Sequence, residues 1–139
     1  MDAEGTAWAA GFFDGEGSIN IVRQKKAKPL ETVHHALLVS VSQVDPRPLQ
    51  YLQENFGGSI YTRKFKKAEW KIAHNWAIRS QQAEDFLRTI RPYARVKGEQ
   101  IDIALAFREI KANGGRYQGV DTQANEAREV MKGRLQDSR

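Results

Sequence analysis

The sequence predicts an α+β fold in which one four-stranded antiparallel sheet is covered by helices on one face only. A helical pattern followed by two alternating segments occurs twice, first over residues 6–42 and again over residues 45–79. Alternation of apolar and polar residues is typical of strands with one buried face. Further helical patterns follow, and no remaining segment supplies an apolar partner for the second face of the sheet.

Composition limits the class of protein. With 139 residues, we expect residues 1–139 to form a single domain with a substantial core. The absence of cysteine excludes disulfides and thiolate metal sites. The net charge of +5 permits a polyanionic partner without requiring one. No apolar run approaches membrane-spanning length and no signal-peptide pattern begins the chain, so we expect an intracellular protein with no membrane partner. We also expect no organic cofactor.

The first unit opens with a helix over residues 6–14, for which Thr6 is a candidate N-cap. Segments 18–24 and 33–42 then alternate, and a basic turn between them predicts a hairpin. Ile19 and Ile21 fall on the face expected to meet the helices. The outward positions of this hairpin and its turn are Ser18, Asn20, Val22, Gln24, Lys26, Lys28, His34, Ala36, Leu38 and Ser40.

The second unit repeats this order. Asp45 is a candidate N-cap with Pro46 at the first helical position, and Gly57-Gly58 ends the helix. Segments 59–66 and 70–79 predict a second hairpin, and Ser80 is expected to cap a third helix that stops before Pro92. A helix over residues 97–112 and a charged helix over residues 121–135 complete the chain, with residues 113–139 forming a C-terminal helical extension.

The uncovered sheet face is rich in polar and basic residues. Lysine and arginine neutralise phosphates, while Asn, Gln and Arg reach base edges in a major groove that admits a two-stranded ribbon. On composition alone, an ordinary solvated sheet face explains this pattern better. The second hairpin contributes Tyr61, Arg63, Lys64, Lys66, Asn75 and Arg79 to the candidate DNA-binding face.

One short motif favours the DNA-binding interpretation of this face over an ordinary solvated one. Residues 9–17, AAGFFDGEG, extended by Trp8 and Ser18, resemble the LAGLIDADG signature of homing endonucleases. The resemblance continues in order through Val41-Ser42-Gln43, Gly57-Gly58, Ile60-Tyr61, Trp76-Ala77-Ile78, Pro92-Tyr93 and Val96-Lys97, and it is weakest over residues 113–139. It implies the α-β-β-α-β-β-α fold of that family, with a saddle-shaped sheet, and site-specific cleavage of double-stranded DNA.

The glycines of the motif suggest a close contact. Gly11 and Gly15 lie four residues apart, on one helical face, and small residues at this spacing let two helix backbones approach closely. Packing against the chain's own core would also use them. Because the chain has one motif, the resemblance implies a homodimer in which two copies of the helix cross on a two-fold axis. Trp8 and Phe12 are then expected in the chain's own core, and the interface residues are expected to be Ala10, Gly11, Phe13, Asp14 and Gly15.

The acids of the motif suggest a metal. In such a dimer two copies of Glu16 would lie close together, and a divalent cation would relieve their repulsion. Hard oxygen ligands favour Mg²⁺, for which other divalent cations could substitute, with the carbonyl of Gly15 as a further ligand. The resemblance implies a structural role for Asp14, which is expected to bond backbone at the end of the helix.

Three further site residues follow from the resemblance. It implies that Gln43 orders water near the metal, that Arg47 contacts the scissile phosphate, and that Lys97 polarises the water or stabilises charge on that phosphate. No HxH or HExxH pattern occurs, so the histidines are interpreted as sheet residues rather than metal ligands.

The leading hypothesis is therefore a homodimeric, Mg²⁺-dependent endonuclease with a long, near-palindromic target. A non-catalytic descendant, either an RNA-splicing maturase or a DNA-binding regulator, is the alternative. An interaction module with a polar sheet is a third reading. The presence of Glu16, Gln43 and Lys97 together favours the enzyme, whereas the target sequence, the host and the intron-encoded or free-standing status of the gene stay open.

Overall fold

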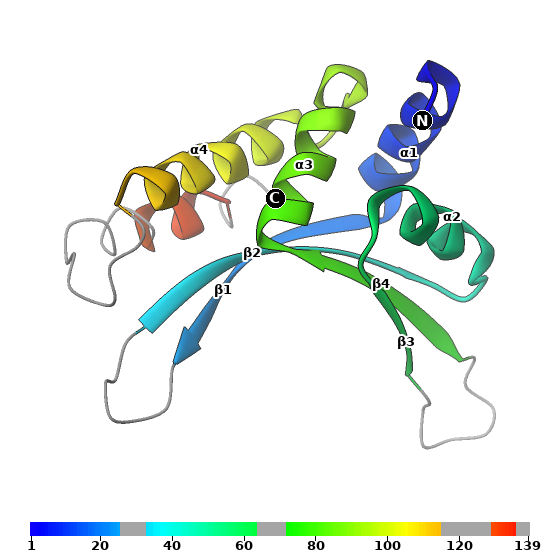
Figure 1. Ribbon diagram of the computed structural model, residues 1–139, viewed down its shortest axis with the longest axis horizontal. Helices are drawn as coiled ribbons and strands as arrows, with labels where there is room; N and C mark the ends of the chain where they lie inside the picture. Colours follow the sequence, from blue (N-terminus) through cyan, green and yellow to red (C-terminus); the bar gives the residue numbers. More distant parts are fainter. Residues whose placement is uncertain (26–32, 64–71, 115–128, 136–139) are drawn as a thin grey trace.

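The computed structural model describes residues 1–25, 33–63, 72–114 and 129–135 (Figure 1). Its elements are α1 (Ala3–Glu16), β1 (Gly17–Lys25), β2 (Val33–Gln43), α2 (Arg47–Phe56), β3 (Ser59–Arg63), β4 (Ala73–Arg79), α3 (Ser80–Ile90), the short 3₁₀ helix η1 (Arg91–Tyr93) and α4 (Gly98–Gly114). Residues 129–135 are also helical.

The sheet has the strand order β1-β2-β4-β3, and all neighbouring strands are antiparallel. Figure 1 shows that the sheet arches like a saddle, with the helices on its convex side and its concave side uncovered. The predicted fold class, the order of the elements and the single covered face are therefore confirmed. None of the described helices is long and apolar enough to cross a membrane.

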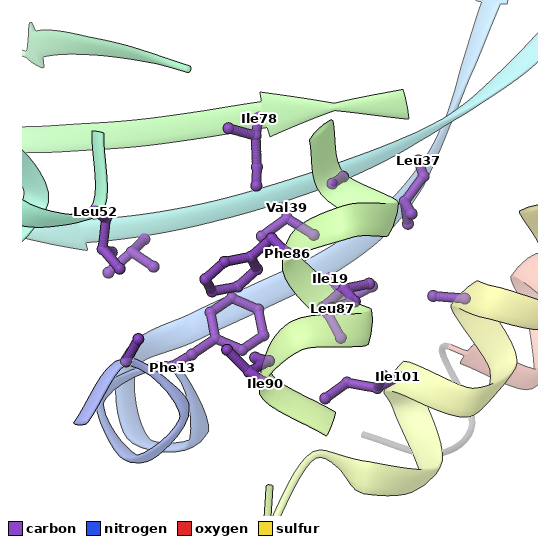
Figure 2. Close-up of a cluster of buried hydrophobic side chains, with 14 of the residues drawn as sticks. Phe13, Ile19, Leu37, Val39, Leu52, Ile78, Phe86, Leu87, Ile90 and Ile101 are labelled. Atoms are coloured by element: carbon purple, nitrogen blue, oxygen red, sulfur yellow. The ribbon is translucent and has the colours of Figure 1, made fainter. Parts of the chain in front are cut away.

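Aromatic side chains from four elements meet in the core between the sheet and the helices. The ring of Phe86 in α3 is contacted edge-on by Phe13, Phe56 and Trp76, with ring centroids 5.2, 4.7 and 5.3 Å away. Figure 2 shows Phe13 and Phe86 at the centre of this cluster, with Ile19, Val39 and Ile78 on the sheet side. Edge-to-face contacts of this kind fix α1, α2 and α3 against the sheet.

The junction of α1 and β1 leaves no room for a side chain. The N–H of Gly17 donates to the carbonyl of Phe13, and a Cβ atom at Gly17 would lie 2.1 Å from the Phe13 ring. The helix therefore passes directly into the first strand, which places its last residue, Glu16, at the sheet. At its other end α1 begins earlier than predicted, because Asp2, not Thr6, is the N-cap and accepts the N–H of Gly5 at 2.8 Å.

Three other boundaries differ from the sequence prediction. Helix α2 begins one residue later than expected, with Pro46 at its N-cap, although Asp45 still accepts the N–H of Arg47 at 2.9 Å. Ser80 is the first residue of α3 rather than its cap, and Arg79 holds the cap position. Helix α4 runs through Gly114, because one glycine lowers helix propensity without forbidding the helix. The expected tip of the second hairpin and most of the expected helix at 121–135 lie outside the described residues.

The C-terminal helical residues 129–135 pack against the rest of the chain. Leu135 is buried in the core cluster, and Glu129 Oε1 lies 2.7 Å from Nε2 of the buried His35 in β2. The hydrogen bond from His35 lowers the pKa of Glu129. Residues 129–135 thus cover part of the convex side of the sheet.

A charged cluster joins α3 to α4. Glu84 accepts from Arg108 Nε at 2.9 Å and from Arg88 Nε at 3.2 Å. Burial raises the pKa of Glu84, but its bonds with the two guanidinium groups outweigh this effect and hold the pKa below the ordinary value of 4.5.

Glu84→Gln is expected to destabilise the protein by about 1–3 kcal/mol at neutral pH, the usual range for hydrogen bonds to charged groups. Because the folded pKa is depressed, the carboxylate stabilises the fold above the ordinary value of 4.5 and loses this effect as pH falls through the folded pKa. Urea unfolding of wild type and variant at several pH values should therefore converge in acid. The exposed neighbour Asp85 provides a control in Asp85→Asn, and a constant difference at every pH would contradict the assignment.

Candidate functional site

The end of α1 presents an exposed carboxylate at the sheet. Glu16 is the last residue of the helix and has no hydrogen-bond or ion-pair partner within the described part of the chain. Carbonyl groups in the last turn of a helix lack partners inside the helix, so the carbonyl of Gly15 is a second potential oxygen ligand. These two oxygen donors are adjacent in sequence, as the motif predicts.

Asp14 turns toward a different segment of its own chain. Its Oδ2 accepts the N–H of Arg95 at 2.7 Å, and its Oδ1 accepts the N–H of Lys97 at 3.1 Å. Burial opposes ionisation of this carboxyl, but the backbone N–H groups of residues 95–97 and the charge of Lys97 leave its pKa lowered overall. The expected backbone bonding of Asp14 is present, although the backbone belongs to residues 95–97 rather than to the turn after α1.

Lys97 lies at the same end of α1. Its Nζ donates to the carbonyl of Asp14 at 2.8 Å, two residues before Glu16. A cation at a helix C-terminus is also favoured by the helix dipole. The structure thus places Glu16 and the amine of Lys97, which are distant in sequence, at the same end of α1.

Gln43 ends β2 near the beginning of β1. It lies two residues beyond Val41, and Val41 is the register partner of Gly17. Gln43 is therefore at the same end of the strand pair as Glu16. Its predicted role in ordering water stays a prediction.

Arg47 occupies a different environment. Its side chain is 84% exposed and forms an ion pair with Asp45, in which the shortest distance is 2.6 Å. This pair holds the pKa of Asp45 at about 2. Both residues line an open pocket with Trp8, Pro48 and Tyr51, near the N-terminal half of α1. Within one chain the pairing directs Arg47 to Asp45, and its catalytic role stays a prediction.

The outward face of α1 differs from the predicted interface. Ala10 and Phe13 are fully buried in the chain's own core and cannot contact a second copy, so their assignment to a dimer interface is wrong. Trp8 is 44% exposed rather than buried in the core, and it stacks on the half-buried Phe12 with centroids 5.1 Å apart. Phe13 is in the core instead of at an interface because its ring, and not that of Phe12, packs against Phe86.

The two motif glycines lie on this outward face. A Cβ atom at Gly11 or Gly15 would meet nothing within 4 Å in the described structure. Together with Trp8 and Phe12, they form a strip at helical spacing that we call the α1 outer strip. Of its two aromatic residues, Trp8 is the more exposed, while Phe12 also packs against the core cluster.

The concave face of the sheet carries the residues predicted to face outward. Ser18 pairs with Ser40, Ser40 with Ala77, and Ala77 with Ser59, which fixes the register of the second hairpin relative to the first. Exposure varies along this face, and Ala36 and Asn75 are nearly buried. The described members of the predicted set on this face are Ser18, Asn20, Val22, His34, Ala36, Leu38, Ser40, Tyr61, Arg63, Asn75 and Arg79.

Four of the lysines predicted for the DNA-binding face lie outside the described residues. Gln24 lies in β1 opposite His34, whereas Lys26, Lys28, Lys64 and Lys66 lie outside the described residues. One residue that the sequence analysis did not select is Ser42, whose hydroxyl donates to the amide oxygen of Asn75 in the cross-strand row Ser42–Asn75–Tyr61. Its position two residues after Ser40 was the available signal.

The donor set fits a metal only in part. Among the described residues, no group of three His, Asp or Glu side chains could hold a metal ion. Mg²⁺ is commonly held by one or two carboxylates, with water and phosphate oxygens completing its shell. The described residues offer Glu16 and the carbonyl of Gly15 at this helix end, so the chemistry suits Mg²⁺ but the site needs ligands beyond these two.

The fold and site define a class of α+β proteins in which a glycine-spaced first helix ends in an acid at the edge of an arched four-stranded sheet. A family model described as LAGLIDADG endonuclease matches residues 9–103. Since the match spans more than half of the chain, the chain belongs to the LAGLIDADG endonuclease family.

Solved structures share this fold. The homing endonuclease I-CvuI, in complex with a DNA target, is 19% identical, with a TM-score of 0.77 over 96% of this chain and 81% of that chain. The archaeal intron-encoded homing endonuclease I-Vdi141I, complexed with DNA, is 16% identical, with a TM-score of 0.76 over 96% of this chain and 83% of that chain. I-SmaMI bound to cleaved DNA also has a TM-score of 0.76 at 16% identity over 96% of this chain, but only 44% of that chain is covered.

A further relative is an RNA maturase rather than an endonuclease. The intron-encoded RNA maturase bI4 of Saccharomyces cerevisiae is 32% identical over 83 residues, which is 60% of this chain. The matching span is only 12% of the maturase. Most of that relative's length therefore has no counterpart in this chain.

Proposed function

We propose that this protein is a homodimeric, Mg²⁺-dependent endonuclease that cleaves double-stranded DNA at a long, near-palindromic site. The observation that carries this proposal is the end of α1. Glu16 is exposed there and has no partner among the described residues, and the amine of Lys97 is bound to the carbonyl of Asp14 in the same last turn. A protein that only binds DNA has no need of an uncompensated carboxylate next to its phosphate-binding surface, because the two negative charges repel.

The concave face is suited to duplex DNA. Strand β2 has 11 residues, which span roughly 37 Å at about 3.4 Å per residue, the length of about 11 base pairs. The polar residues of β1 and β2 face the same side as Arg63 and Arg79. The DNA complexes of I-CvuI and I-Vdi141I support this assignment.

A second copy would complete the site. The α1 outer strip has open space at Gly11 and Gly15, so another helix backbone can approach it closely. A two-fold axis beside this strip places two copies of Glu16 near each other and doubles the length of DNA covered. The chain covers 81% of I-CvuI but only 44% of I-SmaMI, which fits one half of a two-part saddle.

Each site residue then has a defined task in phosphodiester hydrolysis. Mg²⁺, when bound, supplies Lewis-acid stabilisation of phosphate charge and an activated water. Glu16 and the carbonyl of Gly15 would hold it by their oxygens. Lys97 would stabilise negative charge that develops on the cleaved phosphate, and Gln43 would orient water by hydrogen bonding.

A non-catalytic RNA-splicing maturase is the second candidate, and the 32% identity to the yeast maturase favours it. A DNA-binding regulator is a third. The two non-catalytic candidates predict nucleic-acid binding without cleavage.

Incubation with a randomised duplex library tests the proposal. We expect recovery of one near-palindromic site of roughly 20 base pairs, cut on both strands with Mg²⁺ and uncut after chelation by EDTA. Selection of a specific duplex that no divalent cation causes to be cut would favour the regulator. In a parallel selection from a library of structured RNAs, tighter binding to an RNA than to any duplex would favour the maturase.

Arg63→Ala is expected to weaken binding to all duplexes by a similar factor and to reduce the slope of log K against log salt by about 1, because one phosphate contact is lost. Fluorescence anisotropy at several salt concentrations measures this slope. Arg88→Ala, on the opposite side of the sheet in α3, is the matched control. An unchanged slope for Arg63→Ala would remove this residue from the DNA-binding face.

A further inference from the structure

Asp14 and Lys97 hold each other through two kinds of bond. The carboxylate of Asp14 accepts the backbone N–H groups of Arg95 and Lys97 at 2.7 and 3.1 Å. In return, the amine of Lys97 donates to the backbone carbonyl of Asp14 at 2.8 Å. We call these three bonds the Asp14 clasp. It joins the last turn of α1 to a segment more than 80 positions later in the chain.

The ends of this segment are fixed independently. Arg91 in η1 donates to both carboxylate oxygens of Asp102 in α4, at 2.7 and 2.9 Å. A Cβ atom at Gly98 would lie 3.0 Å from the Arg91 guanidinium, so the first residue of α4 lies against the same group. This ion pair links η1 to α4 across the segment that joins them. The Asp14 clasp connects the middle of that segment to α1.

A lysine at a reaction centre needs such a constraint. Its side chain has four rotatable carbon bonds and a strongly hydrated amine, so it loses much freedom when its position is fixed. The clasp holds Lys97 at two points: its backbone N–H is bound by the Asp14 carboxylate, and its amine is bound by the Asp14 carbonyl. Both anchors belong to the helix that ends in Glu16.

We propose that Asp14 is a positioning residue, which fixes the amine of Lys97 relative to Glu16 so that both act on the same phosphate. This inference rests on the proposed nuclease function. It also makes α1 the common support of both groups in each subunit, so that any helix pairing at the α1 outer strip places Glu16 and Lys97 as one unit.

A purely structural role for Asp14 predicts different behaviour. Loss of a structural bond lowers stability and reduces activity to the same extent whether or not Lys97 is present. Loss of a positioning bond acts only through Lys97, so its effect on cleavage disappears when the amine is already absent.

Asp14→Asn is the appropriate change, because an amide keeps the shape but can offer an acceptor to only one of the two N–H groups. Hydrogen exchange of the amides of Arg95 and Lys97, measured without DNA, should become faster. The single-turnover cleavage rate at saturating protein should fall roughly 100-fold, the loss typical of a misplaced catalytic group, while the DNA dissociation constant is unchanged. In a Lys97→Met background, Asp14→Asn should cause no further loss.

Asp85→Asn, which makes the same chemical change at an exposed carboxylate of α3 outside this segment, is the control and should leave the cleavage rate unchanged. If Asp14→Asn does not fold, Asp14→Ser, which keeps one acceptor oxygen, takes its place in the same measurements. A wild-type cleavage rate, or an equal loss in both Lys97 backgrounds, would overturn the proposal. Unchanged amide exchange would overturn it as well, even if the wild-type protein cut no DNA, so this outcome is separate from failure of the nuclease function.

Discussion

Glu16→Gln is expected to reduce DNA cleavage by far more than 100-fold while DNA binding persists. Loss of an outer-shell partner of a metal ligand costs about 10- to 100-fold, and loss of the ligand charge itself costs more. The exposed position of Glu16 means that the fold does not depend on it, so the unfolding midpoint should not change. Removal of a carboxylate next to phosphate should leave binding without metal unchanged or slightly stronger, because a repulsion disappears.

Glu4→Gln is a matched control for this change, since Glu4 is an exposed carboxylate in the first turn of the same helix. Cleavage rates and anisotropy on the selected duplex compare the three proteins. If Glu16→Gln cut DNA at the wild-type rate, the assignment of the metal site to the end of α1 would be wrong. If both variants lost cleavage equally, a general effect of charge would explain the result.

Gly11→Leu is expected to separate the dimer without damaging the subunit. Within one chain the added side chain meets open space, and leucine in place of glycine in a helix favours the fold by up to about 0.8 kcal/mol. At an interface between two helices, the same side chain overpacks the contact by about 1–3 kcal/mol in each copy. The dimer dissociation constant should therefore rise at least tenfold, at about 1.4 kcal/mol per tenfold change.

Sedimentation over a range of concentrations measures this constant, and thermal unfolding of the dissociated chain measures the stability of the subunit. Gly133→Leu is the matched control, because Gly133 is also helical and a Cβ atom there also meets nothing within 4 Å. An unchanged dissociation constant for Gly11→Leu would place the dimer interface elsewhere. A large loss of stability in the isolated chain would show that Gly11 serves the chain's own core.

The sequence was sufficient to predict the sheet because its signals are local. Alternation in the first hairpin assigned Ile19 and Ile21 to the covered face and Ser18 and Asn20 to the other, and the strand register agrees. The glycine pair after α2 also ended that helix as expected, with positive φ at both Gly57 and Gly58. Such features depend on a few neighbouring residues and need no knowledge of the tertiary contacts.

The orientation of α1 could not be predicted in the same way. Its apolar residues, most of them alanines, lie around most of the helix, so hydrophobicity does not separate the face in the chain's own core from the opposite face. Phe12 and Phe13 are chemically identical neighbours, and only the packing of Phe13 against Phe86 decides between them. The prediction was therefore wrong for Phe13, which is buried in the chain's own core, while the assignment of Gly11 and Gly15 to an interface stays a prediction.

The Asp14 clasp also lies beyond sequence patterns. The resemblance indicated that Asp14 bonds backbone, but the backbone in question is more than 80 residues away. No periodicity or capping rule connects two such segments, because their proximity follows from the packing of η1, just before residues 95–97, against α1. For the same reason, the hydrogen bond between Ser42 and Asn75 emerged only from the register of β2 and β4.

In the proposed dimer, two copies of Glu16 form one catalytic centre, and an experiment that mixes subunits examines this arrangement. Wild-type and Glu16→Gln chains are combined in varying proportions at constant total concentration, allowed to exchange, and assayed for double-strand cleavage of the selected site. If both carboxylates are needed, activity should follow the square of the wild-type fraction, because only wild-type pairs cut. Activity proportional to the wild-type fraction itself would contradict the shared site and indicate that each subunit acts alone.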